Sequence, residues 1–200
     1  MLCAADAQIC GSQEWKLYAF PMAEIEQHWY ALKVFYNKVF AVEQELTDAG
    51  IEAYVPTETV VVERDGKRRR VRRPVISSLM FFHSSEEQAL GVQTMLAERA
   101  IVYTHAADTP SQRRRPYAIP EREMEIFRLV TSSGETGLDY FADADIHYEE
   151  GQHVRVIDGP FRGAEGRIQR IRGDRRLLVA IRGICAVATS YIPKQFLQTV

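Results

Sequence analysis

Apolar and polar positions in the first 50 residues predict a strand followed by a helix. The run 29–34 is almost continuously apolar, which is typical of a strand covered on both faces. Beyond it, four apolar residues recur at near-helical spacing and predict a helix over about 37–49. Asn37 stands where the N-cap of this helix would lie, and Gly50 suits the position just beyond its end.

A β-hairpin is predicted next. Residues 51–56 form a second expected strand, and the valine-rich stretch 59–64 leads into Asp65-Gly66, a dipeptide that favours a tight hairpin turn. The return arm is then 68–73, which ends before a proline.

A buried strand and a second helix follow. Residues 79–82 are all apolar and predict a strand, and the serine pair 84–85 can cap the helix behind it. Residues 101–103 predict a further short strand. The apolar residues of the helix are Leu90, Met95 and Leu96.

A polar stretch with prolines over 105–117 predicts an exposed loop, and Pro120 then opens a third helix. The apolar stripe of this helix consists of Met124, Phe127 and Val130. Residues 131–148 are rich in Ser, Gly and Asp and show no period, so they predict an interdomain linker.

Two short strands around a glycine-rich turn are predicted between Val154 and Ile168. Gly163 and Gly166 suit a tight corner, because glycine accepts a positive φ and lets two backbones approach closely. This is how a small SH3-like barrel begins. The pattern therefore divides the chain into an extension (1–28), a first domain (29–130), a linker (131–148) and a barrel domain (149–200).

Composition places the chain among ordinary soluble globular proteins, since 46% of its 200 residues are hydrophobic and 26% are charged. No apolar run approaches the length of about 18–20 residues that crosses a bilayer, and residues 1–10 lack the basic start of a signal peptide. We therefore expect a cytoplasmic protein. Cys3, Cys10 and Cys185 show no C-x-x-C spacing and are interpreted as free thiols.

Charge is distributed unevenly. Residues 151–200 carry nine basic and three acidic side chains (+6), whereas the remainder carries 16 basic and 24 acidic side chains (−8). The densest basic run, 64–73, has seven basic side chains against Asp65 alone. Such a run favours salt-sensitive contact with nucleic-acid phosphates, but a solvated hairpin tip has the same composition, so charge alone leaves both interpretations open.

Neither a catalytic set nor a metal site is indicated. The acids between 139 and 150 fall in the predicted linker without a metal-binding loop template, and the five histidines are scattered. The glycine pair at 163 and 166 is not followed by the Gly-Lys-Ser/Thr of a phosphate loop. We therefore predict no enzyme, no catalytic residue, no metal and no cofactor.

Four pieces of the sequence occur in a meaningful order. They are Trp29-Tyr30 at the start of the first strand, Tyr54-Val55-Pro56 before the arginine-rich hairpin, the apolar run 79–82, and a stretch over 154–168 that resembles a KOW motif. Together, over residues about 29–200, they resemble the NusG family of bacterial transcription elongation factors. Within that family, 119–127 and 187–193 look most like the UpxY-type paralogues, which act on capsular polysaccharide operons.

The resemblance implies an α+β fold, with a four-stranded antiparallel sheet and flanking helices followed by a five-stranded SH3-like barrel. It also implies that the first domain docks on the clamp helices of the RNA polymerase β′ subunit. The docking residues carried over by position are Trp29, Tyr30, Val75, Ile76, Leu79 and Phe81. At least half of them fit the core equally well, because alternate residues of a strand face inward. The serines at 77–78 replace the Pro-Gly or Pro-Asn of many members, which leaves the local loop shape open.

Nucleic-acid and protein contacts follow from the same resemblance. The candidates are Lys33, Asn37 and Lys38 for the non-template DNA strand, Arg68, Arg69 and Arg70 for upstream DNA, and Phe161 and Arg162 for a partner of the barrel. The resemblance implies a ribosomal protein or a termination factor as that partner. Packing of Phe161 across the barrel mouth is the alternative, and a solvated surface is the alternative for each lysine.

The resemblance thus predicts an elongation or antitermination factor that binds RNA polymerase and promotes read-through, at selected operons such as those for capsular polysaccharide. The alternative is a ribosome-associated or RNA-binding KOW protein acting in translation, because KOW barrels also occur in ribosomal proteins. A protein of that class would bind structured RNA with steep salt dependence and without polymerase.

Overall fold

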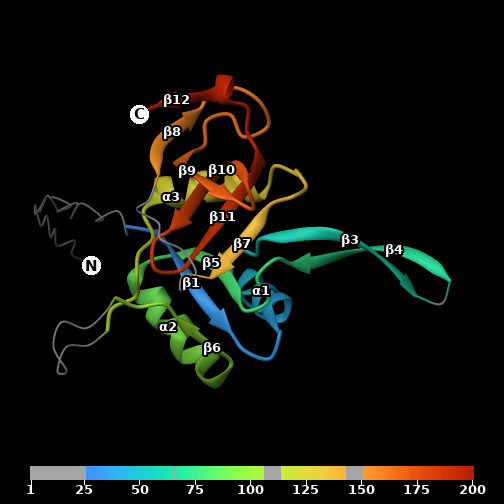
Figure 1. Ribbon diagram of the computed structural model, residues 1–200. Coiled ribbons are helices and arrows are strands. Elements are labelled where there is room, and N and C mark those ends of the chain that lie inside the picture. Colours follow the sequence, from blue (N-terminus) through green and yellow to red (C-terminus); the bar gives the residue numbers. More distant parts are fainter. Residues whose placement is uncertain (1–25, 65, 106–113, 143–150) are drawn as a thin grey trace, which may run out of the picture.

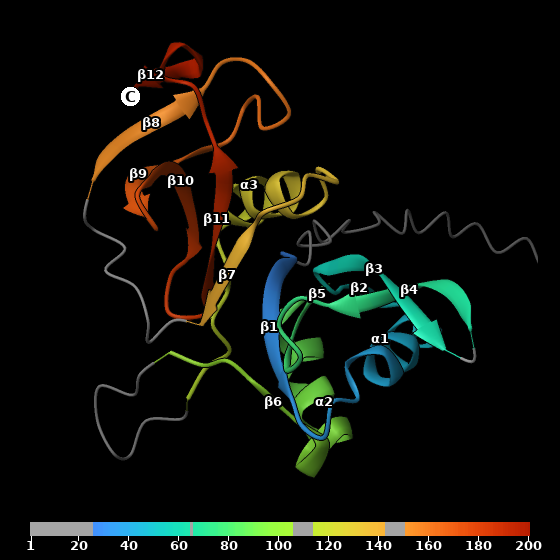
Figure 2. The same ribbon diagram turned by 45° about the vertical axis from the view of Figure 1, so that its right-hand side comes forward.

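Two antiparallel sheets and a projecting hairpin make up most of the computed structural model (Figure 1), which describes residues 26–64, 66–105, 114–142 and 151–200. Helix α3 (Glu121–Thr131) lies between the two sheets (Figure 2). Most of the predicted N-terminal extension, residues 1–25, lies outside the described residues.

The first sheet has the strand order β2 (Glu52–Tyr54), β5 (Leu79–Ser84), β1 (His28–Val34) and β6 (Ala100–Val102), and every neighbouring pair is antiparallel. The predicted four-stranded antiparallel sheet is therefore confirmed. Its central strands β1 and β5 are buried on both faces, as their continuous apolar runs indicated.

Helices α1 (Val39–Asp48) and α2 (Glu86–Leu96) cover one face of this sheet. Ser85 caps α2 as predicted, because its hydroxyl accepts a hydrogen bond from the backbone of Gln88 while the Gln88 side chain accepts one from the Ser85 backbone. A single 3-10 turn, Ala97–Arg99, follows α2.

Two details of these helices differ from the prediction. Lys38, not Asn37, is the N-cap of α1, because Asn37 has a φ of 54° and lies in the left-handed region of the preceding turn. In α2 the predicted apolar stripe is partly wrong, because Leu90 and Met95 are exposed. The buried face of α2 is formed by Ala89, Val92 and Leu96.

The predicted hairpin is confirmed. Within the described ranges, strands β3 (Thr57–Arg64) and β4 (Lys67–Pro74) pair only with each other, and they project away from the first sheet beside α1 (Figure 1). Gly66 in the turn has a φ of 70°, which glycine adopts without strain.

The second sheet has the order β12 (Leu197–Thr199), β8 (Gln152–Val156), β9 (Glu165–Ile171), β10 (Asp174–Ile181), β11 (Cys185–Tyr191) and β7 (Asp139–Ala142). A 3-10 turn, Lys194–Phe196, precedes β12. Among the described residues, the end strands β12 and β7 do not pair with each other, so the strands form an antiparallel sheet without the closure of the predicted SH3-like barrel.

Strand β7 lies within the segment 131–148 that the sequence predicted as an interdomain linker. Tyr140 lies opposite Val187 in the pairing of β7 with β11, and it packs against the core. The strand has four residues and begins with an acid, so it is too short to produce a recognisable alternation. The rest of that segment, 143–150, lies outside the described residues.

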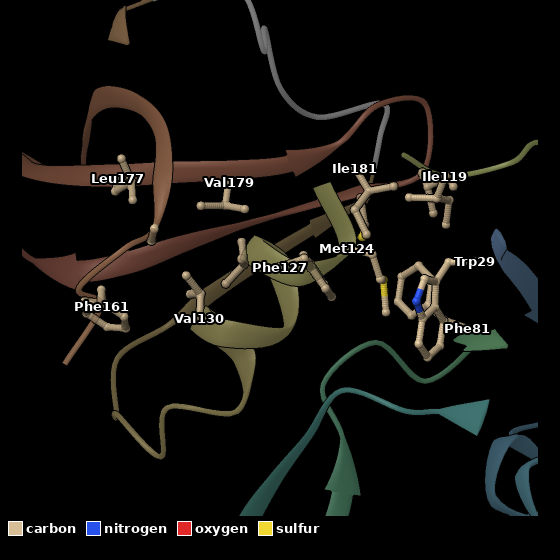
Figure 3. Close-up of a cluster of buried hydrophobic side chains, with 14 of the residues drawn as sticks. Trp29, Phe81, Ile119, Met124, Phe127, Val130, Phe161, Leu177, Val179 and Ile181 are labelled. Atoms are coloured by element: carbon tan, nitrogen blue, oxygen red, sulfur yellow. The ribbon is translucent and has the colours of Figure 1, made fainter. Parts of the chain in front are cut away.

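Helix α3 joins the two sheets through one shared hydrophobic core (Figure 3). The predicted stripe of Met124, Phe127 and Val130 is fully buried, which confirms it as core. On one side it meets the face of β1 and β5 that α1 and α2 leave open, and on the other it meets β10 and β11. The residues that form this shared core on the sheets include Trp29, Leu79 and Phe81 from the first sheet and Leu177, Val179 and Ile181 from the second.

Candidate functional site

The six predicted docking residues fall into three places. Trp29, Leu79 and Phe81 point toward α3 in the shared core, and none of them is more than 2% exposed. Tyr30 lies on the opposite face of the sheet, beneath α1 and α2. Val75 and Ile76 are half-buried in the turn between β4 and β5. The structure therefore brings three of the six together on one face, and Ile76 packs against the same core.

Aromatic and charged contacts from α3 hold it on that face. The rings of Phe81 and Phe127 meet edge to face with centroids 5.5 Å apart (Figure 3). Arg128 stacks over the rings of Trp29 and Tyr54, at 4.9 and 5.2 Å from the ring centroids. At the end of the helix, the hydroxyls of Tyr54 and Thr131 are hydrogen-bonded at 2.6 Å. The sequence offered no signal for Arg128 because its stacking partners are distant in the chain.

The other side of α3 is joined to the second sheet by ion pairs. Arg122 donates to Glu165 at 2.7 Å, and Arg155 also donates to the same carboxylate. The backbone N–H of Arg182 donates to Glu123 at 3.4 Å. Burial raises the pKa of Glu165, but the hydrogen bonds from the two arginines outweigh this effect and hold the pKa below its ordinary value.

Replacing Glu165 by Gln is expected to lower the free energy of unfolding by about 1–2 kcal/mol at neutral pH, because two charge-assisted hydrogen bonds lose their anion. Since the folded-state pKa lies below the unfolded value of about 4.3, the stabilisation is present above that value. It is lost as the pH falls through the folded-state pKa, so wild type and variant should converge in acid. Urea unfolding across pH 3–7 measures this difference.

The matched control is Glu125→Gln, on the exposed side of the same helix, whose carboxylate has no ion pair with any described residue. It should change the free energy of unfolding by less than about 0.5 kcal/mol. A loss of the same size in both variants, or a Glu165→Gln loss that does not shrink in acid, contradicts the role assigned to Glu165.

The other candidates lie on separate surfaces. Lys33, Asn37 and Lys38 are exposed around the turn into α1, where Tyr36 is also 80% exposed. In the second sheet, Phe161 is buried in the shared core, which corresponds to the packing alternative, while Arg162 is exposed.

The register of the hairpin separates the three predicted arginines. Arg69 lies opposite Val62, whereas Arg68 and Arg70 lie opposite Glu63 and Val61. Because successive residues of a strand point to opposite faces, Arg69 is on one face of the hairpin and the other two are on the reverse face.

A fourth arginine of the hairpin, which the sequence did not single out, anchors its base. Arg72 donates two hydrogen bonds to the carboxylate of Glu43 at 2.9 and 3.0 Å and one to Thr57 at 3.2 Å. Its guanidinium also lies 4.9 Å from the ring centroid of Phe40 on α1.

A hollow of about 640 Å³ lies between the base of the hairpin and the segment after α3. Its titratable groups include Glu43, which Arg72 holds, and Tyr140, whose pKa burial raises to about 12. The hydroxyl of Tyr140 therefore stays protonated near neutral pH.

No group of three or more His, Cys, Asp or Glu side chains in the described part of the chain is arranged to hold a metal ion. Within the described ranges, no helix combines the length and apolar character that crossing a membrane requires.

Comparison with known proteins matches two protein-family models to this chain, one after the other along the sequence. The model described as "Transcription termination factor nusG" matches residues 27–128, and that of the KOW motif matches residues 150–179. The "Transcription termination/antitermination protein NusG" of Streptococcus pyogenes serotype M3 is 25% identical over 175 residues, which is 82% of this chain and 92% of that protein.

Two further relatives have the same name. The protein of Campylobacter jejuni is 24% identical over 167 residues, covering 78% of this chain and 88% of its own length. That of Pseudomonas aeruginosa is 28% identical over 132 residues, covering 65% and 69%. The first model spans just over half of the chain, on the α+β unit of the first sheet and its helices, and the KOW motif follows on the second sheet. The protein therefore belongs to the NusG family of transcription termination/antitermination factors.

Proposed function

We propose that this protein is an elongation and antitermination factor that binds the clamp helices of the RNA polymerase β′ subunit and promotes read-through. Membership of the NusG family supports this proposal, and the names of its relatives include both termination and antitermination. The observation that carries it is the apolar face formed by Trp29, Leu79 and Phe81, which is large enough to seat a helix, since α3 occupies it.

Because α3 covers that face, the clamp helices can dock on it only after α3 has moved away. Clamp helices that contact Trp29 and Phe81 must displace α3, which is also held by Glu165 and the core residues of the second sheet. In contrast, Val75 and Ile76 are half-exposed in the turn between β4 and β5, and Ile76 packs at the border of the same face. In the proposed mechanism they make the first contact with polymerase, and the buried residues join only after α3 has moved.

Replacing Val75 by Asp is expected to weaken binding to purified bacterial RNA polymerase by about tenfold or more, because a charge then enters an apolar contact. The matched control is Ile101→Asp on β6, since Ile101 is 50% exposed and outside the predicted docking set. Circular dichroism verifies that both variants are folded. Equal polymerase affinity for the two variants would argue against docking at this border.

Read-through is tested in a transcription assay on a template with a terminator. The full chain should raise the full-length transcript, and Val75→Asp should not. A folded protein that binds polymerase but leaves the read-through fraction unchanged would contradict the antitermination proposal.

We further propose that the protein acts in the cytoplasm at selected operons, such as those for capsular polysaccharide, in the manner of UpxY-type paralogues. The second sheet acts as the SH3-like unit that recruits a ribosomal protein or a termination factor, with Arg162 on its accessible surface.

A further inference from the structure

A two-stranded basic ribbon projects from the described part of the molecule (Figures 1 and 2). Each arm, β3 and β4, has eight residues, which corresponds to a length of about 26 Å. The residues 61–64 and 66–73 are all exposed, and neither arm pairs with another described strand. A ribbon of this kind has two accessible faces and two accessible edges.

The two faces of the ribbon differ in whether their cations lie close to carboxylates. One face, here called the open face, carries Arg64, Lys67, Arg69 and Arg73, and none of these four lies within 4.0 Å of a carboxylate of any described residue. Its one acid is Glu58, opposite Arg73. On the reverse face, Arg72 is held by Glu43, and Arg68 lies 3.8 Å from Glu63. The open face therefore has the larger surplus of positive charge.

The open face also contains exposed apolar groups between its cations. Val62 lies opposite Arg69 and is 37% exposed, and Val71 lies opposite Val60 and is 44% exposed. Neither valine belongs to a hydrophobic core cluster of the described residues. Their exposure between cations suits a partner that combines phosphates with apolar groups.

The base of the ribbon is fixed by the Arg72 contacts to Glu43 and Phe40, which hold β4 against α1. The backbone N–H of Val75 also donates to Pro56 across the base at 3.0 Å. The ribbon is thus presented at a set angle, so binding loses less conformational freedom than it would for a free loop.

We propose that the open face of the β3–β4 ribbon inserts into the major groove of duplex DNA. That groove is about 12 Å wide and admits a two-stranded β-ribbon, and it presents thymine methyl groups to apolar side chains. The major groove of an A-form RNA duplex is too narrow for this mode. The four cations of the open face contact the flanking phosphates, and Val62 and Val71 contact the groove floor. The inference goes beyond the proposed function, which names no DNA site, and rests on that proposal only for its role in transcription.

Fluorescence anisotropy of the full chain with a 20-base-pair DNA duplex, without polymerase, tests the proposal. The protein should bind this duplex at least about tenfold more tightly than an RNA duplex of the same sequence. Lys67→Ala/Arg69→Ala should weaken DNA binding by about tenfold or more at 0.1 M salt and reduce the slope of log K against log salt by about two.

The matched control is Arg68→Ala/Arg70→Ala, which removes the same charge from the reverse face of the same ribbon. It should weaken binding by less than about threefold and reduce the salt slope by less than one. Equal losses for the two pairs overturn the assignment to the open face, and equal affinity for DNA and RNA duplexes overturns insertion into the major groove. Because the assay contains no polymerase, loss of polymerase binding alone leaves this inference standing, and failure to bind the duplex leaves the polymerase proposal standing.

Discussion

Replacing Phe127 by Ala is expected to lower the free energy of unfolding by about 3–5 kcal/mol, the largest effect that we predict. The Phe127 side chain has no exposed surface, packs edge-on against Phe81, and lies in the core that both sheets share. Its removal leaves a cavity between two layers that cannot both collapse onto α3. Urea denaturation followed by circular dichroism measures the loss.

Leu129→Ala on the same helix is the control for helix propensity and handling, because Leu129 is 38% exposed. It should cost less than about 1 kcal/mol. Hydrogen exchange distinguishes a shared core from two independent ones. If the core is shared, Phe127→Ala lowers the protection of amides in both β1 and β10, whereas loss of protection in one sheet alone contradicts the arrangement.

A second large effect is expected for Gly166→Ala. A Cβ at position 166 would lie 2.3 Å from the backbone oxygen of Leu178 and 3.1 Å from its carbonyl carbon. Both atoms belong to the main chain of β10, so neither can move aside without shifting the strand pairing of β9 and β10. We expect a loss of about 3 kcal/mol, the upper part of the range for overpacking. Urea denaturation of the variant measures it.

The same substitution at Gly91 has the opposite expected sign. Gly91 lies within α2, and a Cβ there would meet no heavy atom within 4 Å. Gly91→Ala should therefore raise the free energy of unfolding by about 0.5–1 kcal/mol through helix propensity. If Gly166→Ala were as stable as wild type, the close approach of β9 and β10 at this point would be wrong.

Local signals predicted much of the fold. The hairpin followed from its turn dipeptide, the α3 stripe from its spacing, and the α2 cap from a serine before the helix. The buried side of α2 did not follow, because the apolar residues Leu90 and Met95 are exposed, whereas Ala89 and Val92 face the sheet. Packing against the sheet decides which side of α2 is buried. A helix period alone contains no information about which stripe meets a neighbour.

The candidate site was less accessible to sequence reasoning, because its decisive contacts join distant parts of the chain. The alternation of β1 separates Trp29 from Tyr30, but it does not reveal that α3 covers Trp29. The contacts of Arg72 with Glu43 and of Arg122 with Glu165 likewise span 29 and 43 positions. Charge counts indicated that the hairpin is basic, whereas only the strand register separates its cations into two faces.

The central position of α3 also has a consequence during synthesis. The first sheet can be complete when residue 102 has emerged, yet its Trp29 face stays uncovered until α3 follows. The outer side of α3 stays uncovered until the second sheet has been synthesised. The core residues of that sheet extend to Ile192, roughly sixty positions after the end of the helix. At about 5–20 residues per second this interval lasts about 3–12 s. During that interval the nascent chain exposes the apolar outer side of α3, to which other proteins could bind until the second sheet covers it.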